Sequence, residues 1–167
     1  FEAKWKPQGE DDFAPDQQAV THLDPVREIK ATLVSQPNPF LEVALSSQTL
    51  VKSQRVWPAP AQNDGADITI FNGTMPPANW SGKDTVLINP PQSGFFGERI
   101  GPIEKPLVSE IDKDAALMRF ADVSDVQLRH ATEFKPAPGA HVYVDSFGKP
   151  LVFGHWESEP RWLVIAF

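Results

Sequence analysis

The sequence contains no cysteine, no long hydrophobic run and no cluster of basic residues. Without cysteine, disulfide bonds, thiolate zinc sites, iron–sulfur clusters and a cysteine nucleophile are excluded. No apolar run approaches the ~20 residues that a membrane-spanning helix needs. The chain has 15 lysine and arginine residues against 22 aspartate and glutamate residues, a formal net charge of -7. An acidic chain without a basic stripe is not expected to bind nucleic acid as its main task.

Proline, by contrast, is in surplus, with 17 among the 167 residues, or about twice its usual ~5% share. The prolines fall between apolar runs instead of forming one tract, mainly at positions 37/39, 58/60, 76/77, 90/91 and 136/138. This distribution predicts short elements separated by turns. With 41% hydrophobic residues, the chain is long enough to bury a core.

The first 25 residues differ from the rest. Residues 1–6 alternate between apolar and polar, an acidic loop follows at 9–16, and residues 18–23 form a plausible return strand. Because two strands cannot bury a core, we predict that residues 1–25 are the end of a β-sandwich module or a linker. The remainder of that module would lie outside this chain.

Residues 26–167 predict an α/β domain with an open, mostly parallel sheet. A strand is expected at 29–33, and then a helix with Asn38 as its N-cap and Pro39 at its first position. The i, i+4 spacing predicts that one helix face is buried, made of Phe40, Leu41, Ala44 and Leu45. Further strands of this half are expected at 54–57, 67–71 and 84–88.

The last third of the chain predicts mainly strands. They are expected at 123–130, 140–145, 150–153 and 161–167, separated by turn signals rich in proline and glycine. The sequence stops inside the last of these apolar runs. We therefore expect the domain to be truncated at its C-terminus.

Four polar residues are candidate ligand contacts because they lie at the ends of expected strands. In open α/β sheets, ligands bind at the carboxyl edge, where helix N-termini also point. The candidates on this edge are Ser35, Asn38, Asn72 and Asn89. A small-ligand or glycan-binding domain at this edge is one alternative function, with stacking surfaces available from Trp57, Trp80, Trp156 and Trp162.

No residue is assigned to catalysis, and no metal or cofactor is expected. Ser93 is the only hydroxyl in the turn at 89–94, where two successive prolines offer no N–H group for an oxyanion. No two histidines have the three- or four-residue spacing of a helical metal pair, although strands can bring His130, His141 and His155 together. A hydrolase or amidase that uses Ser93 or a His/Asp pair remains a second alternative.

Several runs together resemble a known family. The sequence is similar to the region that follows the von Willebrand factor A domain in bacterial BatA-like membrane proteins, often labelled aerotolerance regulators. The likeness covers nearly the whole chain and is carried by EDDFAPDQQA at 10–19, PNPFLEVAL at 37–45, ADITIFNGTMPP at 66–77, VLINPP at 86–91, PGAHVYV at 138–144 and WLVIAF at 162–167.

This resemblance implies a domain that looks like the class I glutamine amidotransferase (flavodoxin-like) fold. Enzymes of that fold use a cysteine on the turn after a strand, where this chain has Asn89, Pro90 and Pro91, so their activity does not carry over. The Asp-x-Ser-x-Ser run of a von Willebrand metal site is also absent.

The implied location is the cell envelope, on the periplasmic or otherwise extracytoplasmic side of a bacterial inner membrane. Membrane contact would be made only through segments outside this chain. The expected partners are other domains of the parent protein and envelope proteins, with no nucleic acid. We therefore predict a non-catalytic interaction or structural module of a membrane-anchored envelope protein.

Overall fold

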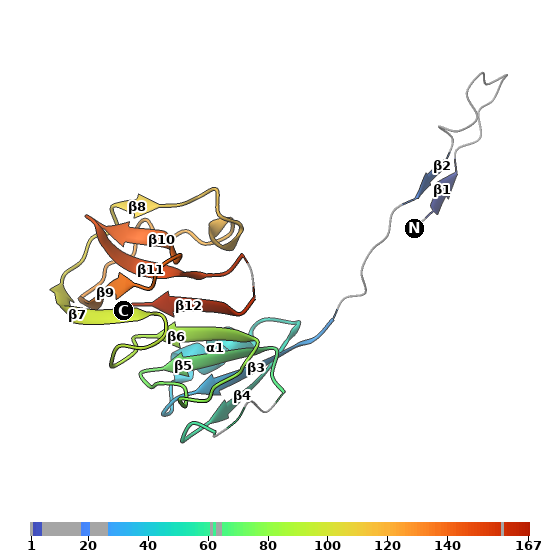
Figure 1. The fold of residues 1–167 in the computed structure, drawn as a ribbon. Coiled ribbons are helices and arrows are strands. Elements are labelled where there is room, and N and C mark those ends of the chain that lie inside the picture. Colours follow the sequence, from blue (N-terminus) through green and yellow to red (C-terminus); the bar gives the residue numbers. More distant parts are fainter. Residues whose placement is uncertain (1, 5–17, 21–26, 61, 63–64, 158) are drawn as a thin grey trace, which may run out of the picture.

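A computed structural model describes residues 2–4, 18–20, 27–60, 62, 65–157 and 159–167 of the chain (Figure 1). It contains an eight-stranded sheet in the order β4-β3-β5-β6-β12-β11-β10-β8, a two-stranded ribbon of β7 and β9, and a hairpin of β1 and β2. The strands are β1 Glu2–Lys4, β2 Gln18–Val20, β3 Ile29–Val34, β4 Val51–Val56, β5 Ile68–Asn72, β6 Asp84–Ile88, β7 Gly97–Glu104, β8 Glu110–Ile111, β9 His130–Pro136, β10 His141–Ser146, β11 Lys149–His155 and β12 Arg161–Ile165. The helical elements are α1, Pro39–Ser46, and the 3-10 turn η2, Ala116–Met118.

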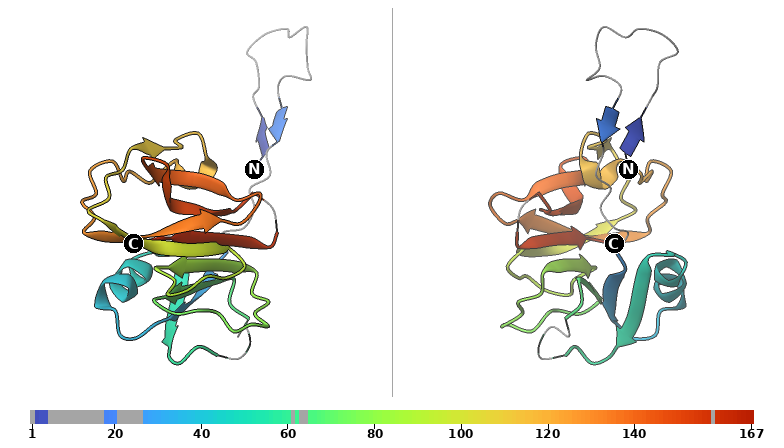
Figure 2. Two further views of the ribbon diagram at one scale, coloured as in Figure 1. Left: turned by 60° about the vertical axis from the view of Figure 1, so that its left-hand side comes forward. Right: turned by 90° about the vertical axis from the view of Figure 1, so that its right-hand side faces the viewer.

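The large sheet changes character at β12. Strands β4, β3, β5, β6 and β12 are parallel, whereas β11, β10 and β8 continue the sheet in antiparallel pairs. Figure 2 shows the resulting halves, with β3–β6 and α1 on one side of β12 and β9–β11 on the other. The prediction of an α/β domain with a strand-rich last third is confirmed, and the sheet combines parallel with antiparallel strands.

Most of the predicted strands are present, with some corrections. The runs at 29–33, 67–71, 84–88, 140–145, 150–153 and 161–167 correspond to β3, β5, β6, β10, β11 and β12. The strand expected at 54–57 begins earlier, at Val51. The strand expected at 123–130 is wrong, because this segment is irregular and β9 begins at His130. Its apolar residues Val123 and Leu128 instead pack on the core from a loop.

The N-terminal hairpin has the predicted pairing. Strands β1 and β2 are antiparallel, with Glu2 opposite Val20 and Lys4 opposite Gln18. The predicted acidic loop at 9–16 lies outside the described residues. That the hairpin belongs to a β-sandwich module stays a prediction.

One of the two clusters of buried residues lies between the sheet and the β7–β9 ribbon. The aromatic rings of Phe134 in β9 and Phe153 in β11 are 5.9 Å apart, and Phe96 adds a ring 5.7 Å from Phe134. All three side chains are buried. The Thr132 N–H of β9 also donates a 2.7 Å hydrogen bond to the carbonyl of Ala166, just beyond β12. The ribbon is thus fixed to the centre of the sheet by packing and by its backbone.

Helix α1 begins as predicted, but its surroundings do not match the prediction. The Asn38 side chain accepts a 3.3 Å hydrogen bond from the Leu41 N–H, and Pro39 occupies the first helical position. No residue of the helix is buried, and Phe40 is 88% exposed. The expected buried face is therefore wrong, because α1 packs on the edge strand β4.

The N-cap gives a first test of the local structure. We expect Asn38→Ala to lower the free energy of unfolding by about 1 kcal/mol, since one N–H of the first turn loses its acceptor. Asn38→Asp keeps that acceptor and is the matched control. Urea denaturation followed by circular dichroism measures both variants, and equal stability of Asn38→Ala and the unchanged chain would contradict the capping role.

Candidate functional site

The sheet brings the four predicted ligand contacts to one edge. Ser35 follows β3, Asn72 ends β5 and Asn89 follows β6. In the parallel register, Val34 is paired with Phe71 and Asn72 with Ile88, so these strand ends lie side by side. Asn38 sits a few residues further on, as the cap of α1.

At this edge, three of the four side chains make hydrogen bonds within the fold. The Ser35 hydroxyl is buried and donates to the Gln36 carbonyl at 2.6 Å. The Asn38 oxygen caps the helix, and the Asn89 side-chain oxygen accepts a 3.4 Å hydrogen bond from the Thr132 hydroxyl. None of the four lines any of the cavities described below.

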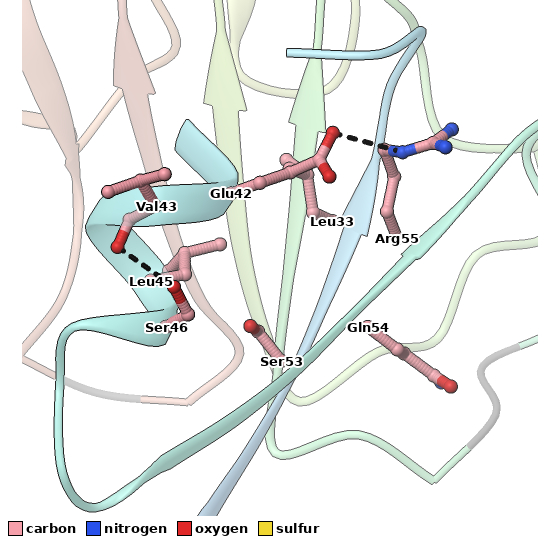
Figure 3. Close-up of a pocket in the computed structure, with 8 residues that line it drawn as sticks. All are labelled: Leu33, Glu42, Val43, Leu45, Ser46, Ser53, Gln54 and Arg55. Atoms are coloured by element: carbon pink, nitrogen blue, oxygen red, sulfur yellow. Dashed lines mark hydrogen bonds and ion pairs between the residues drawn. The ribbon is translucent and has the colours of Figure 1, made fainter. Parts of the chain in front are cut away.

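A groove instead lies between α1 and β4 (Figure 3). It has a volume of about 300 Å³ and is lined by Leu33, Glu42, Val43, Leu45, Ser46, Ser53, Gln54 and Arg55. The Glu42 carboxylate on α1 forms an ion pair with Arg55 Nε on β4, at a distance of 3.1 Å. The same carboxylate accepts a 3.1 Å hydrogen bond from the Asn38 N–H. The groove therefore has a mixed lining, with one ion pair fixing the helix to the strand.

The strand beside this groove is an open edge of the sheet. Within the described part of the chain, β4 pairs only with β3. The carbonyls of Leu50 and Val56 accept hydrogen bonds from the β3 side, at 2.8 and 3.3 Å. Because backbone groups alternate in direction along a strand, Ser53 and Arg55 point their N–H and C=O groups away from the sheet.

Several apolar side chains of α1 and of the residues that flank β4 are exposed. Phe40 and Val43 on α1 are 88% and 65% exposed, and Leu50 and Trp57 at the two ends of β4 are about half exposed. The charges of β4 that normally discourage pairing at an edge are each bound to a carboxylate. Lys52 pairs with Glu28 at 2.8 Å, and Arg55 pairs with Glu42.

This site was not predicted from the sequence. Its signal is the polar run of Lys52, Ser53, Gln54 and Arg55 inside a strand. A strand buried on both faces is a continuous apolar run, so such a polar run is typical of an edge.

The serine alternative finds no support in the geometry. The Ser93 hydroxyl accepts a 2.9 Å hydrogen bond from the Arg99 N–H. Among the residues that the structure describes, no histidine bonds to Ser93. The base and orienting group that a serine nucleophile requires are therefore not beside it.

A His/Asp pair does form, between β10 and the segment before η2. His141 Nε2 lies 2.6 Å from Asp112 Oδ2, and this hydrogen bond, with the backbone N–H groups of Asp114 and Ala115, lowers the pKa of Asp112. His141 and His155 line one cavity, whereas His130 pairs with Glu104 at 2.9 Å. No serine or threonine hydroxyl in the described ranges bonds to His141, so the pair has no adjacent nucleophile.

The four tryptophans do not form one stacking surface. Trp80 and Trp162 line a cavity of about 180 Å³ together with Phe95. Trp156 lines a different cavity, and Trp57 lies beyond β4. The Trp80 Nε1–H donates to the Thr85 hydroxyl at 3.1 Å, so this ring is fixed as part of the packing.

These features define a mixed α/β domain with few helices and a large sheet that combines parallel and antiparallel strands. No protein-family model matches the chain, and no curated protein matches its sequence. A solved structure, the cytoplasmic protein STM3548 from Salmonella typhimurium, is similar in fold with a TM-score of 0.58. It is 10% identical, and the match covers 83% of this chain and 87% of that one.

This comparison corrects the expected location. The neighbour is named as a cytoplasmic protein, which contradicts the cell-envelope, periplasmic or extracytoplasmic location that the sequence resemblance implied. At 10% identity the likeness shows the fold alone, and the name describes the Salmonella protein. The described residues include no helix long and apolar enough to cross a membrane. The predicted envelope location is therefore wrong.

Proposed function

We propose that this chain is a non-catalytic interaction module that binds an extended segment of a partner protein along β4. The observation that carries the proposal is the open edge, where the backbone groups of Ser53 and Arg55 face outward beside the α1 groove. In strand addition, an edge supplies backbone hydrogen bonds and a neighbouring pocket selects side chains. The groove lined by Leu33, Val43 and Leu45 suits one apolar side chain of the added strand.

Helix α1 supports this function. A helix of a single compact domain normally buries an apolar stripe against the core, yet no residue of α1 is buried. Exposed apolar side chains beside an edge strand are typical of a surface that a partner covers. The expected partner is another domain of the same parent protein or a separate protein, and no nucleic acid is required.

The non-catalytic assignment rests on the residues at the carboxyl edge of the parallel strands, where an enzyme of this fold class would carry its nucleophile. The chain has no cysteine, and Ser93 is bonded to the Arg99 backbone. The strand end that would carry a nucleophile continues into Pro90 and Pro91, which have no N–H to offer an oxyanion. No serine or threonine hydroxyl of the described residues bonds to His141 in the pair of His141 and Asp112.

We also propose the finer fold assignment, a degenerate class I glutamine amidotransferase-like domain related to BatA-like proteins. The five parallel strands, numbered along the chain, have the order 2-1-3-4-5, which is the order of flavodoxin-like sheets. Where such folds place helices on both faces, this chain has α1 as the only α-helix of its described residues. The resemblance of the sequence runs to BatA-like proteins supports this proposal.

The proposed edge can be tested with two substitutions at one position. Ser53→Pro removes the outward N–H, a change that edge strands tolerate when that N–H is not in the ladder, whereas Ser53→Ala keeps it. Peptides selected from a displayed library on the unchanged chain are titrated against both variants by calorimetry. We expect equal affinity for Ser53→Ala and about tenfold weaker binding to Ser53→Pro, since one backbone hydrogen bond is lost.

Hydrogen exchange of the unchanged chain makes the test independent of how well Ser53→Pro folds. On peptide binding, the amides of Ser53 and Arg55 are expected to become protected. Peptides that bind without protecting them, or that bind Ser53→Pro with full affinity, would overturn the strand-addition proposal. Selection of peptides matching β4 itself would identify a second copy of this chain as the partner.

A further inference from the structure

The two edges of the large sheet differ in how they are protected against pairing with another chain. Strand β4 lies at one edge and β8 at the other (Figure 1). Strand β8 has only two residues, and a very short edge strand is one of the devices that prevent edge-to-edge pairing. Strand β4 has six residues, contains no proline and keeps one unbroken register with β3 along its length. It therefore offers a straight edge on which a strand of equal length can pair.

The charges on β4 do not select a strand of opposite charge. Its four central side chains are all exposed, namely Lys52, Ser53, Gln54 and Arg55. The Lys52 ammonium is 2.8 Å from the Glu28 carboxylate, and Arg55 is 3.1 Å from that of Glu42. Because both cations already have a carboxylate beside them, the edge suits a partner strand that is close to neutral.

A second β4 strand meets this requirement when it runs antiparallel about a two-fold axis at Ser53. The outward backbone groups of β4 belong to Val51, Ser53 and Arg55, since those of the alternate residues face β3. On the axis, the Ser53 N–H of each copy donates to the Ser53 carbonyl of the other. Lys52 then lies opposite Gln54 of the second copy, and Arg55 lies opposite Val51. No two like charges are directly opposite each other.

The neighbouring registers are less favourable. An axis at Lys52 places this residue opposite its own copy, and an axis at Arg55 does the same with two arginines, although like charges directly opposite destabilise a strand pair. An axis at Gln54 places Lys52 opposite the apolar Val56. In the register described above, Val56 instead lies opposite Leu50, whose side chain is 45% exposed in the single chain. Charge and apolar pairing thus favour the same register.

We propose, building on the strand addition inferred above, that the segment bound along β4 is β4 of a second copy of this chain. The two large sheets then continue into one another across the two-fold axis at Ser53. Such a contact uses the same surface on both copies and closes at a dimer. It pairs the long edge of each sheet and leaves the short β8 as the outer edge.

The first test is sedimentation equilibrium of the whole chain over a range of concentrations. We expect a reversible monomer–dimer equilibrium, with Ser53→Ala giving the same Kd as the unchanged chain. Ser53→Pro is expected to raise the Kd about a hundredfold, because each copy loses one backbone hydrogen bond to the other.

Two substitutions at Gln54 test the register without removing a backbone group. Gln54→Glu places a carboxylate opposite Lys52 of the second copy, whereas Gln54→Lys places a second ammonium there. Both variants lose the 3.2 Å hydrogen bond from the Gln54 amide to the Thr32 hydroxyl, so this loss is common to the pair. We expect the dimer of Gln54→Glu to be tighter than that of Gln54→Lys by about tenfold, since two such charge pairs form in each dimer.

Cross-linking locates the axis, because the chain contains no other cysteine. Ser53→Cys brings two residues together with a Cα separation of ~5.5 Å, which a disulfide can span. Thr49→Cys is the matched control just before β4, where the two thiols are ~27 Å apart because Thr49 lies opposite Trp57 of the second copy. Under mild oxidation, Ser53→Cys is expected to form covalent dimers about tenfold faster or more.

The outcomes separate this proposal from the proposed function. A chain that stays monomeric at high concentration, while library peptides still protect the amides of Ser53 and Arg55, excludes the second copy as partner and leaves strand addition in place. A dimer in which Ser53→Cys and Thr49→Cys cross-link equally, or in which Gln54→Glu and Gln54→Lys have the same Kd, also overturns the proposal, and these variants decide it even if Ser53→Pro does not fold. Monomeric behaviour together with peptides that leave both amides unprotected overturns the two proposals at once.

Discussion

Replacing Phe153 by alanine is expected to lower the free energy of unfolding by about 3–5 kcal/mol. Phe153 is fully buried in β11, and its ring meets those of Phe134, 5.9 Å away, and Trp162, 6.4 Å away. The substitution removes the ring that joins the β7–β9 ribbon to the sheet and leaves a cavity that the surrounding strands cannot close. Stabilities of domains this size are ~5–15 kcal/mol, so the loss is a large fraction of the total.

The control for this prediction is another phenylalanine. Phe120 is 94% exposed, and Phe120→Ala is expected to change stability by less than about 0.5 kcal/mol. Guanidinium unfolding, followed by tryptophan fluorescence, measures both. If Phe153→Ala lost no more stability than Phe120→Ala, that result would contradict the described packing of the ribbon on the sheet.

The second large effect is expected at Gly154, the next residue of β11. A Cβ built on Gly154 would lie 2.3 Å from the Trp162 carbonyl oxygen and 2.9 Å from the Leu163 Cα, both backbone atoms of β12. Backbone in a paired strand cannot move aside as a side-chain end can. Gly154→Ala is therefore expected to lower stability by about 3 kcal/mol, at the upper end of the usual range for overpacking.

Gly101 provides the matched control, because it also lies in a strand, β7, and a Cβ there meets nothing within 4 Å. We expect Gly101→Ala to be neutral within about 0.5 kcal/mol. The two variants are compared by thermal unfolding. Equal midpoints would show that β11 and β12 do not approach each other as closely as described.

The parts of the fold that were predictable are those decided by local chemistry. Strand β6 is a short apolar run that ends before Asn89 and Pro90, and the predicted range agrees with the observed one. The start of α1 follows from Asn38 and Pro39, whose capping geometry needs no distant contact. Here neighbouring residues specify the structure.

The parts of the fold that the sequence did not predict depend on contacts between segments that are distant along the chain. Strand β7 contains Gly101 and Pro102, which disfavour a strand, and it forms because β9 pairs with it. The exposure of Phe40 depends on β4 being an edge strand, which the spacing of apolar residues in the helix cannot show.

The candidate sites were only partly predictable for the same reason. Ser35, Asn72 and Asn89 were correctly placed on one edge, because parallel strands end together. The pairing of His141 with Asp112 joins residues 29 positions apart, and no local pattern marks it. Likewise, the outward backbone of Ser53 and Arg55 is set by which neighbours β4 has.

The position of β12 has a consequence for how the protein is made. Strand β12 lies between β6 and β11, although β7 to β11 all separate it from β6 along the chain. During synthesis, β6 therefore remains an unprotected edge until β12 leaves the ribosome, and the two halves of the sheet join only then. Folding dominated by such distant pairing is slow and exposes the intermediate to aggregation, so a chaperone that shields β6 would raise the yield of the native domain.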